Sequence, residues 1–249
     1  MVNQLTSDVN AADAAYSRTL GNGLRVLELL RHNPAGLGVA AIASALDLHR
    51  TVVYRLLGTL RAHDLVTTAG DGRYQLGTGL VELAGTVRAD LRSAAEPHLT
   101  RLAADTTATA FLTVADQDEA VGICVVEPPH AQLHVSYRLG TRHPLTVSAA
   151  GVAILAARLP VPGEREEITR ARQRGYAVTA GELQPGAWGL ATALPAGDGP
   201  AWASVGVVAL SELDTPATAE AVRAAAEAIA GSSAARSLDT RTGYSVYCP

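Results

Sequence analysis

Cysteine and lysine are the clearest shortages in this chain of 249 residues. Its only cysteines, Cys124 and Cys248, lie far apart in the sequence, so no disulfide framework is expected. All twenty basic residues are arginine and none is lysine. Because this holds for the whole composition, arginine at any one position is no evidence of a choice over lysine.

Long apolar runs are also lacking. The N-terminus has no apolar stretch following basic residues, so no signal peptide is expected. No stretch reaches the roughly 18 apolar residues, free of charge, that a transmembrane helix requires. These absences predict a soluble protein of the cytoplasm, with no membrane partner.

Motifs of common enzyme classes are lacking as well. The chain has no G-x-S-x-G, no H-E-x-x-H, no phosphate-binding loop and no dinucleotide fingerprint. Cys124, His130 and His134 are residue types that bind metals, but the "VGICVV" around Cys124 is typical of a buried strand. We therefore expect no catalytic residue, no metal and no cofactor, with a small-molecule enzyme left as an alternative. A solvated helix start is the expected place for three acidic residues: Glu164, Glu166 and Glu167.

Charge is unevenly distributed along a chain whose length suits two modest domains. The net charge is −4, and 48% of the residues are hydrophobic, which is enough for a large core. Residues 18–76 carry seven arginines and four acidic residues, a local charge of +3, so the rest of the chain carries −7. A basic module joined to an acidic one makes the basic module the candidate for binding nucleic acid.

The basic module has the periodicity of three helices followed by a hairpin. Leucines at three- and four-residue spacing indicate the first helix, and two short apolar runs flank a Gly-Asp-Gly turn. This order within residues 18–77 predicts a winged helix-turn-helix, preceded by a flexible arm at residues 1–17. The predicted elements are a helix from Arg18 with Leu20, Leu24, Leu27 and Leu30, a helix at 39–46, a helix within 49–66, and strands at 65–68 and 73–76.

The third helix, in "HRTVVYRLLGTLRAHDLV", has two different sides when wound at about 100° per residue. One side is an apolar stripe of Val52, Val53, Leu56, Leu57 and Leu60. The other side is cationic and hydrogen-bonding, as expected of a recognition helix that reads base edges and phosphates in the major groove. A winged helix that contacts protein instead of DNA stays open as an alternative. The predicted DNA-binding residues are His49, Arg50, Thr51, Tyr54, Arg55, Gly58 and, on the wing, Arg73.

The remaining sequence predicts an α+β domain with an antiparallel sheet flanked by helices. A helix at 79–91 is expected to link the two domains, within 78–92, and to pack against a partner chain. The domain at 93–249 follows. One helix of this domain is expected to start at Pro97, and three more are expected at 150–158, 164–174 and 215–230. The expected strands are 108–115, 120–127, 132–138, 176–180, 187–194 and 201–210.

Two sets of motifs resemble the IclR family of bacterial transcriptional regulators. The first is "GLRVLELL" with "LGVAAIASALDLHRTVVYRLLGTLRAHDLVTTAGDGRYQLGTGLVELA", and the second is "LGTRHPLTVSAAGVAILA" with "RGYAVTAGELQPGAWGLATALPA". The resemblance covers about residues 20–230. It implies a GAF-like effector-binding domain and a homodimer, or a homotetramer as a dimer of dimers. It also implies binding to a palindromic double-stranded DNA operator, as a repressor more than as an activator.

The "SAAGVAIL" segment opens a helix with small residues, whose free backbone N–H groups suit a small anion. A small-molecule effector, such as a small organic acid, is therefore expected there, although small residues also serve tight packing of helix on sheet. Tyr137 and Trp188 lie nearby and could face the pocket or the core. The resemblance and the helix start together imply these effector-binding residues: Val135, His143, Ala149, Ala150, Gly151, Thr179, Glu182, Ala187 and Gly189.

Overall fold

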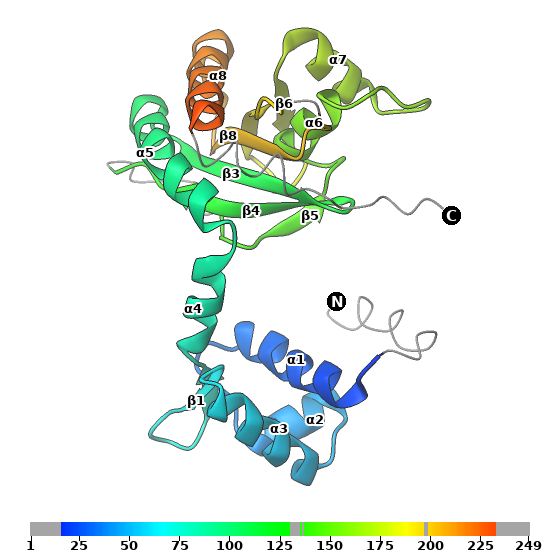
Figure 1. Cartoon of the computed structure of the whole chain (residues 1–249), viewed down its shortest axis with the longest axis vertical. Helices are drawn as coiled ribbons and strands as arrows, with labels where there is room; N and C mark the ends of the chain where they lie inside the picture. Colours follow the sequence, from blue (N-terminus) through cyan, green and yellow to red (C-terminus); the bar gives the residue numbers. More distant parts are fainter. Residues whose placement is uncertain (1–15, 130–134, 136, 197–198, 233–249) are drawn as a thin grey trace. The chain divides into compact units, whose positions relative to one another are not determined.

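The computed structural model describes residues 16–129, 135, 137–196 and 199–232 (Figure 1). Most of the predicted N-terminal arm therefore lies outside the described residues. The chain divides into two compact units, Met1–Val87 and Arg88–Pro249. Among the described residues, no helix has the length and apolarity needed to cross a bilayer.

The first unit contains the predicted three helices and hairpin. The two strands pair antiparallel, with Val66 opposite Leu76 and Thr68 opposite Tyr74. A bridge between Leu37 and Tyr74 ties this hairpin to the segment before the second helix. The elements are α1 (Arg18–Arg31), α2 (Val39–Leu46), α3 (Arg50–Ala62), β1 (Val66–Thr68), β2 (Tyr74–Leu76) and α4 (Gly79–Thr86).

Local signals set the ends of these helices. The Ser17 hydroxyl accepts a hydrogen bond from Leu20 N and caps α1, and His49 Nδ1 accepts one from Thr51 N at the start of α3. Asp47 ends α2 in the left-handed conformation, at φ 52°. The turn between α2 and α3 is thus made by the left-handed Asp47, whose backbone N–H donates to the Ala43 carbonyl, and by the side-chain cap of His49.

Part of the predicted apolar stripe of α1 was wrong. Leu20 and Leu24 are 63% and 50% exposed, whereas Val26 and Leu30 are buried in the core of the unit. Gly21 and Gly23 also lie on the buried side. The helix is turned so that its glycines face inward, and the first two leucines of the pattern therefore point to solvent.

Val52 of α3 was also wrongly assigned to the core, because it is 39% exposed. The other four residues of the predicted stripe, Val53, Leu56, Leu57 and Leu60, are buried. These four already form a complete three- and four-residue pattern. Val52 precedes that pattern by one residue and so falls at its edge.

The predicted single helix at 79–91 is broken. Helix α4 ends at Thr86, Arg88 adopts the left-handed conformation at φ 50°, and α5 (Ala89–Thr106) begins after it. Pro97, expected to start a helix, lies inside α5. Proline removes one backbone hydrogen bond there. The buried face of α5 packs on the sheet and holds the helix together across that position.

The second unit is built on a six-stranded antiparallel sheet in the order β5-β4-β3-β8-β7-β6. The alternation of β3 separates its two faces: Ala110 and Leu112 pack with α5 and α8, whereas Phe111 packs with α6 and α7. The antiparallel sheet flanked by helices is as predicted. Its elements are β3 (Thr109–Asp116), β4 (Glu119–Val126), β5 (Arg142–Pro144), α6 (Ala149–Ala156), α7 (Glu166–Arg174), β6 (Ala177–Ala180), β7 (Trp188–Ala193), β8 (Ala203–Ala209) and α8 (Thr215–Gly231).

The edge next to β4 differs from the prediction. Most of the predicted strand at 132–138 lies outside the described residues, and its described positions are not in a strand. The short strand β5 pairs with β4 instead, with His143 opposite Ala120. Pro144 is compatible with an edge strand, because the missing N–H is not needed on the open side.

Candidate DNA-binding surface and ligand pocket

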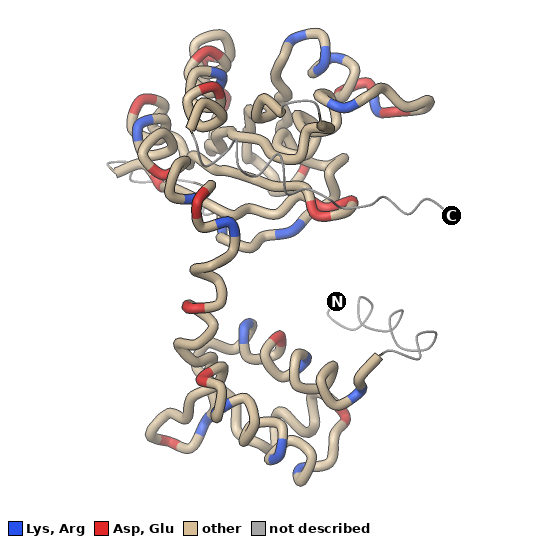
Figure 2. Tube along the Cα trace, in the orientation of Figure 1, with Lys and Arg blue, Asp and Glu red and all other residues tan. Residues whose placement is uncertain are grey.

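The predicted recognition residues lie on one exposed face of α3. Arg50, Thr51, Tyr54, Arg55 and Gly58 are all exposed, and cationic positions recur along this helix in Figure 2. A Cβ added at Gly58 would meet no atom within 4 Å. Packing within the unit therefore does not require glycine there, and the gap in the side-chain surface is free for an outside partner.

His49 and Val52 differ from what the sequence predicted for this part of α3. The His49 ring contacts Thr51 Oγ1 at 3.1 Å besides capping the helix, so both residues also shape the start of α3. Val52 is a residue that sequence reasoning missed, because its apolar side chain was counted with the core. It lies at the edge of the apolar stripe, where 39% of it is exposed.

Arg73 lies on the wing and pairs with Asp71 across the turn, Nε to Oδ2 at 3.2 Å. Both side chains are more than half exposed. Such an exposed pair contributes only about 0–1 kcal/mol, so Arg73 can exchange Asp71 for a phosphate at little cost.

A pocket of about 380 Å³ lies in the second unit, and its lining comes from five separate segments. It contains eight of the nine predicted effector residues, and Gly151 is the exception. A Cβ at Gly151 would collide with the Leu145 carbonyl, so this glycine permits close packing of the preceding loop. The lining is Phe111, Val135, Tyr137, Arg138, Thr141, Arg142, His143, Ser148, Ala149, Ala150, Thr179, Glu182, Leu183, Gln184, Ala187, Trp188, Gly189 and Val208.

The start of α6 offers fewer free donors than the sequence predicted. Ala149 N donates to Thr179 Oγ1 at 3.1 Å, and Gly151 N donates to Ser148 Oγ at 3.1 Å. Within the described part of the chain, Ala150 N is the donor of this turn left without a partner. The expected row of free N–H groups for an anion is therefore mostly occupied by side-chain oxygens.

Three polar side chains form a chain of contacts along the pocket wall. Tyr137 Oη lies 2.9 Å from His143 Nε2, and His143 Nδ1 lies 3.2 Å from Ser148 Oγ. Burial lowers the pKa of the His143 imidazole, which favours the neutral ring, and burial raises the pKa of the Tyr137 phenol. Tyr137 and Trp188 both line the pocket, and Trp188, only 5% exposed, also packs in the core with α5 and α8.

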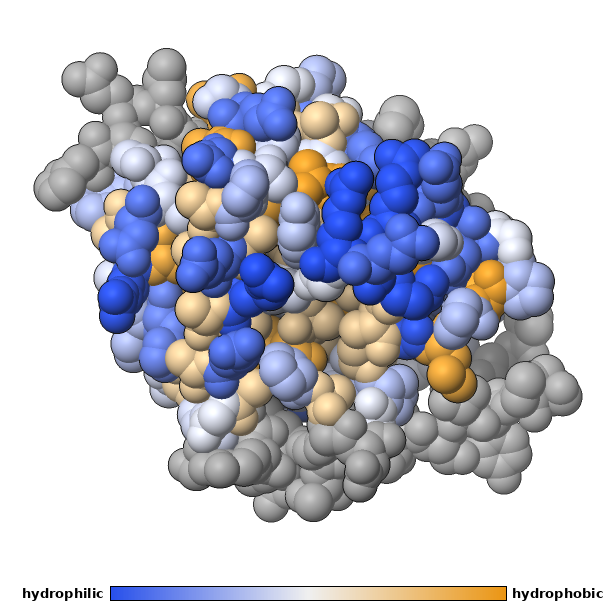
Figure 3. All heavy atoms as spheres, turned by 90° about the horizontal axis from the view of Figure 1, so that it is seen from above, coloured by the Kyte–Doolittle hydropathy of each residue, from blue (hydrophilic) through white to orange (hydrophobic). Residues whose placement is uncertain are grey.

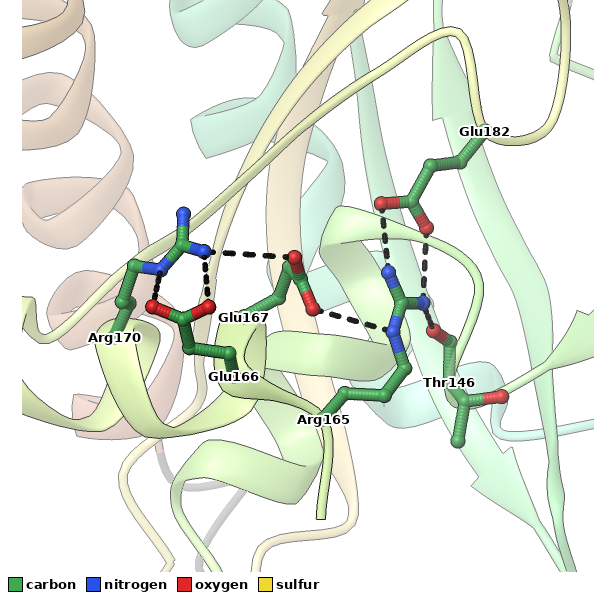
Figure 4. A network of polar contacts seen from close by, with 6 residues as sticks. All are labelled: Thr146, Arg165, Glu166, Glu167, Arg170 and Glu182. Atoms are coloured by element: carbon green, nitrogen blue, oxygen red, sulfur yellow. Dashed lines mark hydrogen bonds and ion pairs between the residues drawn. The ribbon is translucent and has the colours of Figure 1, made fainter.

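Glu182 lines the pocket, but its charge is already balanced. Arg165 binds both of its carboxylate oxygens, at 3.1 Å each, and also pairs with Glu167 and donates to the Thr146 carbonyl (Figure 4). Arg142 is likewise paired, with Asp116 and Glu119.

Arg138 is the lining arginine for which the described residues provide no ion-pair partner. Sequence reasoning missed Arg138 and Phe111. The family motifs do not include them, although Phe111 is the single phenylalanine of the chain.

The acidic run around the start of α7, formed by Glu164, Glu166 and Glu167, is not simply a solvated helix start. Glu166 is 76% exposed, but the Glu164 side chain is only 11% exposed. Glu164 binds Arg172 through both carboxylate oxygens and accepts a hydrogen bond from Thr169, and the Arg172 contact chiefly lowers its pKa to about 2. Hydrophilic side chains gather over α7 in Figure 3.

The metal-type residues do not form a described site. Cys124 is half-buried in β4 against the α5 side of the sheet, and burial raises the pKa of its thiol. His130 and His134 lie outside the described residues. Within the ranges that the structure describes, no group of three or more potential metal ligands occurs.

Comparison with known proteins matches two family models in sequence order. The IclR helix-turn-helix domain matches residues 19–70, and the bacterial transcriptional regulator IclR C-terminal domain matches residues 84–161. Together they span just over half of the chain, and both describe regulators, not enzymes.

Individual relatives agree with the family models. The HTH-type transcriptional regulator Rv1719 of Mycobacterium tuberculosis is 33% identical over 60% of this chain and 56% of its own length. The DNA-binding transcriptional repressor YiaJ of Escherichia coli is 31% identical over 57% of this chain and 51% of its own. The matches thus span about half the length of these relatives.

A solved structure extends the likeness in fold to nearly the whole chain. The IclR homologue of Microbacterium hydrocarbonoxydans complexed with 4-hydroxybenzoate has a TM-score of 0.71 at 24% identity, covering 85% of this chain and 97% of its own. This chain belongs to the IclR family of bacterial transcriptional regulators.

Proposed function

We propose that this chain is an effector-responsive repressor that binds a palindromic operator with α3 in the major groove. The observation that carries the proposal is the exposed face of α3, which combines two arginines, a threonine, a tyrosine and a bare glycine. Arginine reads guanine with two hydrogen bonds, and glycine lets the backbone approach DNA closely. Arg73 adds a phosphate contact from the wing.

A second copy of the chain completes the proposed DNA-binding form. Two helices of the first unit expose large apolar side chains: Leu20 and Leu24 on α1, and Val81 and Leu83 on α4. A two-fold dimer would cover these residues and would present two α3 helices to two half-sites about one helical turn apart. The dimer, or a dimer of dimers, therefore fits a palindromic operator.

The pocket of the second unit is the proposed effector site. Its apolar part is formed by residues such as Phe111, Leu183 and Val208, and Arg138 adds a positive charge. This composition suits a small organic acid with an apolar body. The fold neighbour complexed with 4-hydroxybenzoate carries a ligand of this kind. YiaJ is named a repressor, which supports the proposal that this chain represses transcription.

The test uses the purified full-length chain and DNA from upstream of its own gene. We expect it to retard a fragment with an inverted repeat, to bind a scrambled repeat far more weakly, and to have at least a dimeric mass by light scattering at micromolar concentration. Equal binding to both fragments would favour the alternative of a protein-contact winged helix. A strictly monomeric protein would contradict the palindromic arrangement.

A further inference from the structure

The polar chain of Ser148, His143 and Tyr137 has an assignable direction of hydrogen bonding. Ser148 Oγ accepts the bond from Gly151 N, so its own proton must go to another acceptor. Ser148 is only 4% exposed, and His143 Nδ1, 3.2 Å away, is the acceptor that the described residues provide. A buried hydroxyl without an acceptor is costly, so His143 Nδ1 carries no proton.

Placing the His143 proton on Nδ1 instead would leave more hydrogen-bonding groups without a partner. A proton on His143 Nδ1 would be directed toward the Pro144 carbonyl, at the longer distance of 3.4 Å. The Ser148 proton would then have no acceptor. The neutral His143 ring therefore holds its proton on Nε2, which donates to Tyr137 Oη at 2.9 Å.

Tyr137 Oη accepts that bond, so the phenol proton must point away from His143. Within the described part of the chain, the buried Thr113 hydroxyl lies beside the phenol and has no other partner, and Tyr137 Oη can accept from it as well as from His143. Tyr137 lines the pocket, and so does its neighbour Arg138. A ligand oxygen placed here would accept from the phenol and meet the guanidinium.

We propose that His143 is a positioning residue that makes the Tyr137 hydroxyl a hydrogen-bond donor into the pocket, so that the effector is a compact carboxylate with its oxygens beside Tyr137 and Arg138. The proposal rests on the effector-binding function proposed above. It moves the anion away from the start of α6, where Thr179 and Ser148 already use two of the donors.

The direction of the hydrogen bonds from Ser148 through His143 to Tyr137 can be tested without a ligand. The ¹⁵N shifts of labelled histidine distinguish the two neutral tautomers, and His143→Gln assigns the signal of this ring. We expect the form protonated on Nε2 in the wild type. Ser148→Thr keeps a hydroxyl and a helix cap, and should keep that tautomer. Ser148→Asp also caps the helix but has no proton to donate, so Nδ1 should become protonated. A wild-type ring protonated on Nδ1 would overturn the positioning role.

The ligand class is tested by calorimetry with benzoate and 4-hydroxybenzoate on the full chain. Tyr137→Phe keeps the ring that packs against Phe111, at 5.2 Å between centroids, and should weaken carboxylate binding at least tenfold. Tyr176→Phe, outside this pocket, is the matched control and should bind as the wild type. Equal affinity in Tyr137→Phe would overturn the donor assignment. Failure of the wild type to bind either acid would overturn the ligand class and the proposed effector site, whatever the tautomer.

Discussion

The candidate sites of the two units are built in different ways. In the first unit, the candidate DNA-binding residues are exposed, and all but Arg73 of the wing lie on α3 or at its N-cap. In the second unit, the pocket takes residues from five segments, and their charges and protons depend on partners far away in sequence, such as Arg165 on Glu182. A helix face can therefore be found by periodicity alone, whereas a pocket lining and its electrostatics need the fold.

Two helical glycines make this comparison testable, because one is required by packing and the other is not. Gly151→Ala should cause the largest change, a loss of about 3 kcal/mol in the free energy of unfolding, since the new Cβ collides with the backbone of Leu145. Urea unfolding of the purified protein measures it. A neutral effect would mean that the loop before α6 can move aside.

Arg50→Ala tests the exposed face of α3 and should weaken operator binding by about 1–3 kcal/mol if Arg50 grips a guanine. The melting temperature should stay the same, because the side chain lies outside the core. Arg101→Ala is the matched control, since Arg101 is exposed in the other unit and pairs with Asp105. Unchanged operator affinity would remove Arg50 from the reading surface.

Gly58→Ala should have opposite effects on stability and on binding. The open space around Gly58 and the better helix propensity of alanine predict a gain of about 1 kcal/mol in the free energy of unfolding. Operator affinity should fall, since the added methyl group stands between the helix and DNA. Stabilisation without loss of affinity would show that DNA does not approach this part of α3.

The smallest effect concerns the ion pair of Glu164 with Arg172. Because this contact lowers the pKa of Glu164 to about 2 from its ordinary 4.5, its stabilising contribution is present above about pH 4.5 and is lost as the pH falls toward 2. The melting temperature of the wild type should therefore fall more between pH 6 and pH 3 than that of Glu164→Gln. Glu166→Gln, at an exposed position, should follow the wild type. Parallel curves for all three proteins would contradict a role of this pair in acid stability.

The amino-acid sequence by itself determined the order of elements in the first unit and the exposed face of α3. Both follow from local periodicity, capping residues and a turn of glycine and aspartate, which act over a few residues. Local patterns gave wrong predictions for apolar residues that could lie either in the core or on the surface. Leu20 and Val52 are apolar yet exposed, because the core has room for only one stripe of each helix.

Only the tertiary structure decided the break between α4 and α5, the packing role of Gly151 and the polarity of the pocket. Arg88 and Pro97 carry no local signal that outweighs the packing of α5 on its sheet. Ala149 N at the start of α6 looked free in the sequence because its acceptor, Thr179 Oγ1, lies 30 residues away. Hydrogen-bond partners are chosen by distance in space, and that distance exists only once the sheet has formed.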